Sequence, residues 1–441
     1  MNPFKLTASE AALRIAKGEL TSETLVSSCL SCIAEVDANI KAWTYLDPDY
    51  ALEQAKSRDS YQQSGQPTGP LHGVPVGIKD IFDTADMPTE NGTVLCAGRQ
   101  PDADAKIVSL LREAGAVILG KTVTTECAVH YPGKTLNPHD PTRTPGGSSS
   151  GSAAGVAASM MPLAIGSQTN GSVIRPASFC GIYGFKPTHG RISRRGVLLL
   201  SRALDVVGGF ARSVDDLALL VDSLFAFDER DADMHMRGKS HLIETVAEQP
   251  PLSPKIAFIK TPVWERTDAN CQTAFTEMVD ALGDNCEEVT LPDIFDRAIE
   301  FHKTIMNADL ALNLASLYDR GKDQLSGVLQ GLIEDGQKTL AVDYNHSLHM
   351  VSVLYAELVK VLQKYDAILT PATTGEAPVG LGSTGDPIFC TLWSLLGTPA
   401  VTLPILKGAN GMPIGAQLIG ARFDDARLLR TARWLDQLIG K

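Results

Sequence analysis

Strand-like and helix-like segments alternate along this chain. Between residues 74 and 79, apolar side chains take every second position, which is the period of a β-strand. A helical pattern at 107–114 then leads directly into a strand-like run at 116–120. Such alternation is typical of layered α/β folds, in which helices pack on a sheet. We therefore expect an α/β protein.

The rest of the chain continues this pattern with one interruption. From 227 to 254, charged residues, three prolines and two histidines replace the apolar periodicity, which predicts a surface excursion and no domain boundary. We expect a single domain over 1–441. Further predicted elements are two helices within 7–40, a helix over 153–161, strands at 163–166, 255–259, 367–370, 400–403 and 416–419, a helical region over 298–363 and a closing helix over 427–439.

The charge and hydropathy of the chain restrict its partners. The 441 residues carry a formal net charge of -12, whereas proteins that bind nucleic acids usually present a basic patch to the phosphates. We therefore expect no nucleic-acid partner. No eighteen apolar residues run together, and the first residues contain no apolar signal core. This pattern predicts a cytoplasmic protein without a membrane span.

Cysteine usage argues against disulfides and metals. Eight cysteines are spread along the chain, which is too low a density for a disulfide scaffold. Cys29 and Cys32 form a CxxC pair, but no second CxxC or nearby histidine pair completes a zinc set. We interpret them as two small residues on an N-terminal helix. No metal or organic cofactor is expected.

Three polar motifs share one chemical logic. Lys79 ends the first predicted strand, within Gly-Ile-Lys-Asp at 77–80. A Gly-Gly-Ser-Ser-Ser-Gly-Ser run occupies 146–152, and Ser172 lies within Thr-Asn-Gly-Ser-Val-Ile-Arg-Pro at 169–176. A serine hydroxyl is a poor nucleophile unless an adjacent base removes its proton. The motifs suggest a serine nucleophile whose base is a lysine.

Together with their neighbours from 71 to 188, these motifs resemble the amidase signature family, which hydrolyses amides through a Ser, cis-Ser, Lys triad. The resemblance implies that Ser172 is the nucleophile, Ser148 the bridging serine and Lys79 the base. It also implies the amidase signature fold, a large mixed β-sheet flanked by helices. The signature core would span about 71–200, and a homodimer is expected by the same resemblance.

This chemistry requires a neutral lysine near pH 7. Moving a lysine pKa from about 10.4 to about 7 corresponds to about 4.6 kcal/mol, which lies within the range that burial can supply. Asp80 would oppose this shift if it faced the lysine, but consecutive residues on a strand point to opposite faces. We therefore expect Lys79 to be buried, with the Asp80 carboxylate turned away.

The residues around the nucleophile predict how a substrate is held. The loop of Thr169, Asn170, Gly171 and Ser172 is rich in residues that tolerate unusual dihedrals, which lets backbone N–H groups converge on a developing oxyanion. The family resemblance implies this role for the loop. Ser149 is expected to assist through a hydrogen bond. Arg175 stands in the order Ser-Val-Ile-Arg-Pro, which resembles malonamidase-like members, in which this arginine meets a substrate carboxylate. Pairing with the chain's own acids is the alternative.

The expected function is hydrolysis of a small carboxamide through an acyl-Ser172 intermediate, with release of ammonia or an amine. The amide is expected to carry a carboxylate if Arg175 binds substrate. We expect the pocket to be shaped by residues of the 227–350 region and by His130 and Tyr131. The substrate itself is not specified by the sequence.

Two other functions share parts of this pattern. The A subunit of a glutamyl-tRNA amidotransferase resembles the same stretch of chain, although the Ser-Val-Ile-Arg order and the somewhat short chain favour a free-standing enzyme. The run at 147–151 also matches the GxSxG elbow of an α/β-hydrolase esterase, with Ser149 as nucleophile. That elbow requires a preceding strand and a late histidine. The residues at 141–145 are turn-like and the last histidine is His349, which disfavours it.

Overall fold

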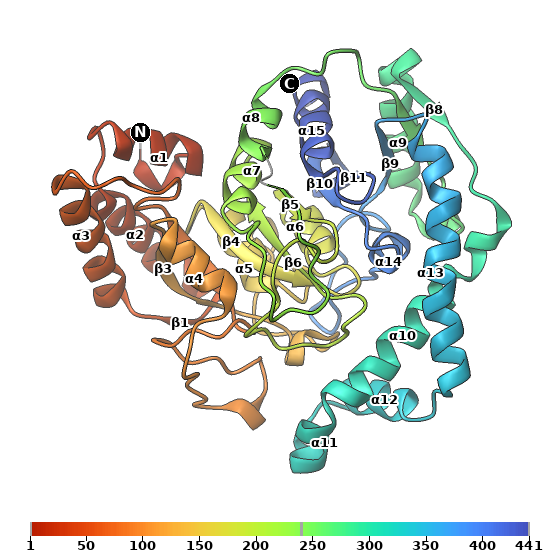
Figure 1. Ribbon diagram of the computed structural model, residues 1–441, viewed down its shortest axis with the longest axis horizontal. Helices are drawn as coiled ribbons and strands as arrows, with labels where there is room; N and C mark the ends of the chain where they lie inside the picture. The colour runs from red at the N-terminus through yellow and green to blue at the C-terminus, as the bar shows by residue number, and fades with distance from the viewer. Residues whose placement is uncertain (1, 239–240, 440–441) are drawn as a thin grey trace.

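The computed structural model describes residues 2–238 and 241–439. Eleven strands form one sheet in the order β1-β3-β2-β4-β6-β5-β10-β11-β9-β7-β8 (Figure 1). Strands β3, β2 and β4 run parallel, as do β8, β7 and β9, and the remaining pairs are antiparallel. The sheet is therefore mixed, and the predicted α/β fold is confirmed. The strands are β1 (Trp43–Leu46), β2 (Pro75–Lys79), β3 (Val117–Thr122), β4 (Leu163–Gln168), β5 (Tyr183–Lys186), β6 (Val206–Ala211), β7 (Ile256–Phe258), β8 (Cys286–Glu288), β9 (Ala367–Pro371), β10 (Ala400–Lys407) and β11 (Pro413–Ile419).

Helices flank the sheet, and four helices of the second half of the chain form a separate group. Helices α10 to α13 stand together at one side in Figure 1, whereas α1 to α3 lie at the opposite end, beside β1 and β3. The helices are α1 (Ala8–Ala16), α2 (Ser22–Ile40), α3 (Pro48–Gln63), α4 (Lys106–Glu113), α5 (Ser150–Ala157), α6 (Ile174–Cys180), α7 (Val214–Asp222), α8 (Leu242–Ala247), α9 (Ala269–Leu282), α10 (Ala298–Asn313), α11 (Ala315–Gly321), α12 (Gly327–Gly336), α13 (Ala341–Leu362), α14 (Ile388–Leu395) and α15 (Asp425–Ile439).

Both ends of the chain follow the sequence pattern closely. The predicted pair of N-terminal helices is confirmed as α1 and α2, and Thr7 and Glu10 form the capping box that starts α1. Cys29 and Cys32 are free, buried residues of α2, in agreement with their interpretation as small packing residues. The closing helix is α15.

The excursion at 227–254 is attached to the fold at several points, among them ion pairs of Asp231 and Asp233 with Arg194. It contains α8, which contacts α7 and α15. Leu242 and Val246 of this helix are buried, so a short apolar anchor interrupts the charged stretch.

The central strands explain how the first two motifs meet. Every residue of β2, β3 and β6 is buried, as expected for strands covered on both faces. In the parallel pair β2–β4, Ile78 lies opposite Ile165. Parallel neighbours end at the same edge of a sheet, so Lys79 at the end of β2 lies beside the last residues of β4, which lead into the Ser172 loop.

Candidate active site

Lys79 is a fully buried lysine that contacts two serines. Its side chain is 0% exposed, and Nζ donates to Ser148 Oγ at 2.7 Å and to Ser167 Oγ at 2.8 Å. Burial lowers the pKa of Lys79 from 10.5 to about 7, against the opposing charge of Asp205. Lys79 is thus buried as expected, and it is in hydrogen-bond contact with Ser148, the predicted bridging serine.

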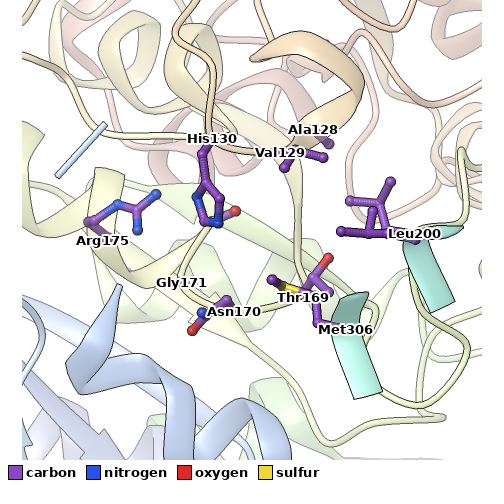
Figure 2. A pocket seen from close by; sticks show the side chains of 11 residues that line it. Ala128, Val129, His130, Thr169, Asn170, Gly171, Arg175, Leu200 and Met306 are labelled. Atoms are coloured by element: carbon purple, nitrogen blue, oxygen red, sulfur yellow. The ribbon is translucent and has the colours of Figure 1, made fainter. Parts of the chain in front are cut away.

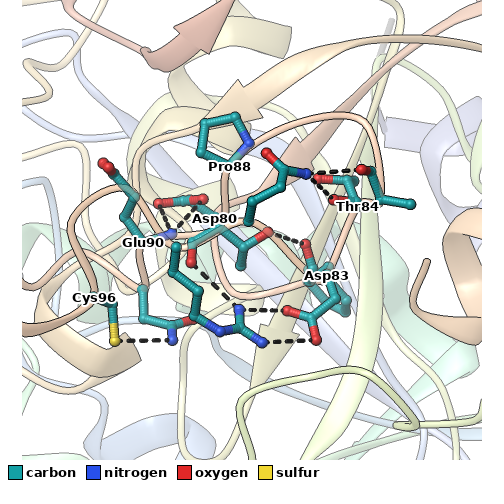
Figure 3. A network of polar contacts seen from close by, with 12 residues as sticks. Asp80, Asp83, Thr84, Pro88, Glu90 and Cys96 are labelled. Carbon is teal, nitrogen blue, oxygen red and sulfur yellow. Dashed lines mark hydrogen bonds and ion pairs between the residues drawn. The ribbon is translucent and has the colours of Figure 1, made fainter. Parts of the chain in front are cut away.

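Asp80 is turned away from Lys79. Strand β2 ends at Lys79, one residue before Asp80, but the Asp80 N–H still donates to the Thr122 carbonyl, which prolongs the pairing with β3. The Asp80 carboxylate lies 3.2 Å from Lys121 Nζ and accepts from the backbone N–H of Glu90 (Figure 3). The buried Asp80 carboxylate is therefore compensated by Lys121 and by a backbone N–H group, and not by Lys79.

Ser148 enters the site from a tight loop before α5. It follows a cis Gly147–Ser148 peptide bond and is 1% exposed. The next residue, Ser149, is the N-cap of α5, and its Oγ lies 3.4 Å from both the backbone N and the carbonyl O of Ser167. Because β3 ends at Thr122 and β4 begins at Leu163, Ser149 follows no strand. This geometry counts against the esterase elbow.

The loop that carries Ser172 is braced on both sides by Gln168. Gln168 is the last residue of β4, and its Oε1 accepts from the backbone N–H groups of Val173 at 2.8 Å and Ile174 at 3.0 Å. Its Nε2 donates to Ser394 Oγ on α14. The strand before Ser172 and the helix after it are thereby joined, which fixes the turn between them.

Each residue before Ser172 has its own support. Thr169 Oγ1 donates to Asp205 Oδ1 at 2.6 Å, and its carbonyl lies 3.1 Å from His302 Nε2. The Asn170 side-chain oxygen accepts from Thr391 Oγ1 at 2.8 Å. A Cβ on Gly171 would lie 2.9 Å from the Cβ of Pro387, so this position requires glycine. Thr169 and Asn170 are thus held by contacts with other segments, as the predicted role of this loop as an oxyanion donor requires.

A narrow pocket opens onto half-buried Ser172. Its free volume is about 20 Å³, room for roughly one water molecule. Figure 2 shows Arg175, His130 and Asn170 on one side and Leu200 and Met306 on the other. The lining residues are Ala128, Val129, His130, Thr169, Asn170, Gly171, Ser172, Arg175, Leu200, Met306 and Leu310.

Arg175 brings an incompletely bonded guanidinium to this pocket. It is 1% exposed, and its Nη2 donates to the Gly147 carbonyl at 2.7 Å and to Thr384 Oγ1 at 3.1 Å. Its Nε and Nη1 have no partner in the part of the chain that the structure describes. Burial lowers the pKa of Arg175 to about 10. The nearby acid Asp386 pairs with Arg266 at 2.6 Å.

The profile of the amidase family matches residues 24–429. The chain belongs to the amidase family. The A subunit of the glutamyl-tRNA(Gln) amidotransferase of Natranaerobius thermophilus is 30% identical, over 100% of this chain and 96% of that protein. The corresponding protein of Chloroflexus aurantiacus is 32% identical, over 98% and 95%.

Solved structures of similar proteins agree. The native peptide amidase of Stenotrophomonas maltophilia is 27% identical, with a TM-score of 0.86 over 99% of this amidase and 97% of that chain. A chain from a vestigial protein complex, described in connection with the origins of an s-triazine catabolic enzyme, is 27% identical, with a TM-score of 0.91 over 98% of both chains. The amidase signature resemblance and its fold are thereby confirmed.

The pocket of this amidase corrects one expectation about its walls. His130 lines the pocket as expected, and burial beside Arg175 lowers its pKa to about 4, so it is neutral near pH 7. Tyr131 does not line it: the side chain is 51% exposed and borders a different surface pocket. His130 and Tyr131 therefore line different pockets, just after a turn in which Cys127 and Ala128 have positive φ angles. Among the described residues of 227–350, those that line the pocket are Met306 and Leu310 of α10.

Four residues of the site were not predicted from the sequence. Ser167, Gln168, Asp205 and His302 contact either Lys79 or the loop before Ser172. Ser167 and Gln168 directly precede the motif at 169–176, so their position in the sequence could have indicated a role in the site. Asp205 and His302 lie far along the chain and carry no motif.

A metal site and a membrane span each place their own requirements on the described residues. In residues 2–238 and 241–439, no cluster of three or more His, Cys, Asp or Glu side chains is arranged to hold a metal ion. Among the described helices, none is long and apolar enough to cross a membrane.

Proposed function

We propose that this amidase hydrolyses a small carboxamide that carries a carboxylate, through an acyl-Ser172 intermediate. The observation that carries the proposal is the contact of buried Lys79 with Ser148, because a lysine with a pKa of about 7 can act as a base at neutral pH. The free Nε and Nη1 of Arg175 support the carboxylate, since a guanidinium binds carboxylates through paired N–H groups.

In the proposed reaction, Ser172 Oγ attacks the amide carbonyl carbon while its proton passes to Ser148 Oγ, and the Ser148 proton passes to Lys79 Nζ. Backbone N–H groups of the 169–172 loop receive the developing oxyanion. The C–N bond then breaks as the proton returns by the same route to the leaving nitrogen. Water attacks the acyl-enzyme with the same proton relay and releases the acid.

The size of the pocket favours a small acyl group. With free volume for about one water, a substrate must displace an apolar side chain, and Met306 is the most flexible of the lining residues. A substrate carboxylate that reached Arg175 would place its amide near Ser172, because both residues line the same pocket.

Participation in a glutamyl-tRNA amidotransferase is the second candidate. The curated relatives described above carry that name and match this chain over nearly its whole length. Glutamine is itself a carboxamide with a carboxylate, so the same residues suit both functions. The two candidate functions differ in assembly. The first requires only copies of this chain, as in a homodimer, whereas the second requires partner subunits.

Ammonia release from purified protein tests the proposal. The substrates are monoamides of short dicarboxylic acids, their neutral methyl-capped counterparts, and glutamine. We expect turnover of the acidic amides, none in Ser172→Ala, and a loss of about 10²-fold or more in kcat/KM in Arg175→Met for the acidic amides only, because two charged hydrogen bonds are removed. Equal loss on neutral amides would refute the carboxylate role. Turnover of glutamine only after addition of amidotransferase partner subunits would favour the second candidate.

A further inference from the structure

Asp205 is a buried carboxylate behind the triad that the reaction above leaves unused. It stands immediately before β6, and its two oxygens accept three hydrogen bonds. Oδ1 accepts from Thr169 Oγ1 at 2.6 Å, and Oδ2 accepts from the backbone N–H groups of Leu200 at 2.7 Å and Ser201 at 3.0 Å. It therefore joins the start of the Ser172 loop to Leu200, the opposite wall of the pocket.

A second small cavity places Asp205 close to the base. This cavity, of about 10 Å³, is lined by Ser167, Thr169 and Asp205 among others. Ser167 also accepts a hydrogen bond from Lys79 Nζ. The Asp205 carboxylate is beyond ion-pair contact with the lysine within the described chain, but its charge acts on Lys79 against the effect of burial.

During acylation, Lys79 must carry the proton that leaves Ser172. The ammonium so formed is fully buried, and a buried cation is unstable without a compensating charge. We propose that Asp205 is a positioning residue of the triad, which fixes the loop before Ser172 through Thr169 and stabilises the protonated form of Lys79 by its negative charge. This inference rests on the proposed function. It adds Asp205 to the predicted triad as a fourth residue, which acts through Thr169 and Lys79 and does not touch the substrate.

The other charged groups nearby have their own partners. Burial raises the pKa of Asp205, whereas its three hydrogen bonds and the positive charge of Arg194 favour the ionised form. Arg194 itself is bonded to Asp231 and Asp233. On α10, Asp309 accepts from Ser201 Oγ and from the hydroxyl of Tyr344.

The histidines of this region stay neutral during the reaction. His302 faces Thr169 from α10 and His130 lines the pocket, and burial lowers the pKa of each to about 4. Neither titrates near pH 7. Burial also lowers the pKa of Lys186 to about 7, but Lys186 donates to the Thr398 carbonyl and lines neither the pocket nor the Asp205 cavity. A change in the pH profile that accompanies an Asp205 substitution therefore reports on Lys79.

The chain contains a matched control for Asp205. Asp216, at the start of α7, is also buried and also accepts two backbone N–H groups and one hydroxyl, from Ala8, Ser9 and the Ser9 side chain. It belongs to a contact with α1 and not to the pocket. Asp216→Asn therefore measures the loss of stability from the same change in hydrogen bonding and charge.

The test is the rate at which a fluorophosphonate labels Ser172 at pH 6 and pH 8. In this reaction the Oγ–P bond forms, the P–F bond breaks, fluoride leaves and the serine proton passes to Lys79, so no amide substrate is needed. With a base of pKa about 7, the ratio of rates at pH 6 to pH 8 is about 0.1 in the wild type. In Asp205→Asn we expect a rate at pH 8 at least roughly tenfold lower and a ratio that rises toward about 0.5, because loss of the negative charge lowers the pKa of Lys79 by up to about one unit.

Two further variants separate charge from position. Thr169→Val removes the hydroxyl bonded to Asp205 but keeps the carboxylate, so labelling should slow with an unchanged pH ratio. Asp205→Ser is a second neutral variant, which keeps the test possible if Asp205→Asn does not fold. The thermal melting of each variant is compared with that of Asp216→Asn. An unchanged pH ratio in both neutral Asp205 variants would overturn this inference alone. Absence of wild-type labelling at Ser172, with Ser172→Ala as the reference, would overturn the proposed function and this inference together.

Discussion

Replacing Lys79 with methionine should make the protein more stable at low pH while abolishing its activity. In the folded protein the pKa of Lys79 is about 7, whereas an exposed lysine has 10.5. Below pH 7 both states carry the proton, and the full penalty of burying it applies. Above pH 10.5 both are neutral and the penalty is gone. In between, folding releases a proton, so stability rises with pH.

The size of this effect follows from the difference in pKa. At 1.36 kcal/mol per pKa unit, a shift of roughly 3.5 units corresponds to about 5 kcal/mol below pH 7, and about 2 kcal/mol remains at pH 9. Methionine removes this penalty at every pH. It also removes the hydrogen bonds to Ser148 and Ser167, at a cost of about 1–3 kcal/mol that does not depend on pH. Lys79→Met should therefore be stabilised by about 2–4 kcal/mol at pH 6 and be near neutral at pH 9.

Urea unfolding of the wild type, Lys79→Met and Ser172→Ala at pH 6 and pH 9 measures this difference. Ser172→Ala is the control, since it removes activity without removing a buried titratable group. Its stability relative to the wild type should be the same at both pH values. A gain in Lys79→Met that is no larger at pH 6 than at pH 9 would show that Lys79 is not a destabilised base.

Three further changes test other parts of the site. Ser148→Ala should lower ammonia release by about 10²- to 10⁴-fold at every pH, because the proton path to the base is interrupted, and retained activity would exclude the relay. Gly171→Val should reduce turnover by at least about 10²-fold, since a Cβ meets Pro387 at 2.9 Å; near-normal turnover would contradict the rigid oxyanion loop. Lys121→Met should destabilise the protein by about 3–5 kcal/mol in urea unfolding, because Asp80 then lacks its cation; an unaltered midpoint would argue against that pair.

The sequence was sufficient to predict the parts of the site that depend on local periodicity. The alternation at 74–79 placed Lys79 on a buried strand and turned Asp80 away, and both orientations were found. The helix expected at 153–161 instead starts at Ser150 and ends at Ala157. Residues 150–152, which lie between the observed and the expected start of this helix, are small and polar, so they gave no apolar pattern from which the start could be predicted.

Other parts could not be predicted, for physical reasons. Strand β6 contains Gly208 and Gly209, which weaken a strand pattern although the fold requires them: a Cβ on Gly208 would lie 2.5 Å from the Phe185 carbonyl oxygen. Asp205 and His302 reach the site only because the chain returns to it after long separations. No periodicity records such contacts, so an isolated buried acid or histidine cannot be recognised from its neighbours in sequence.

The apolar wall and the triad come from different segments of this amidase. Lys79, Ser148 and Ser172 are fixed within the central sheet and its loops, whereas Met306 and Leu310 belong to one helix of the group at the side of the molecule. If the proposed reaction holds, we expect substitutions in α10 to change which acyl group is accepted without altering the contact between Lys79 and Ser148. Natural variation and directed evolution can alter the substrate range of such an enzyme while leaving its catalytic chemistry intact.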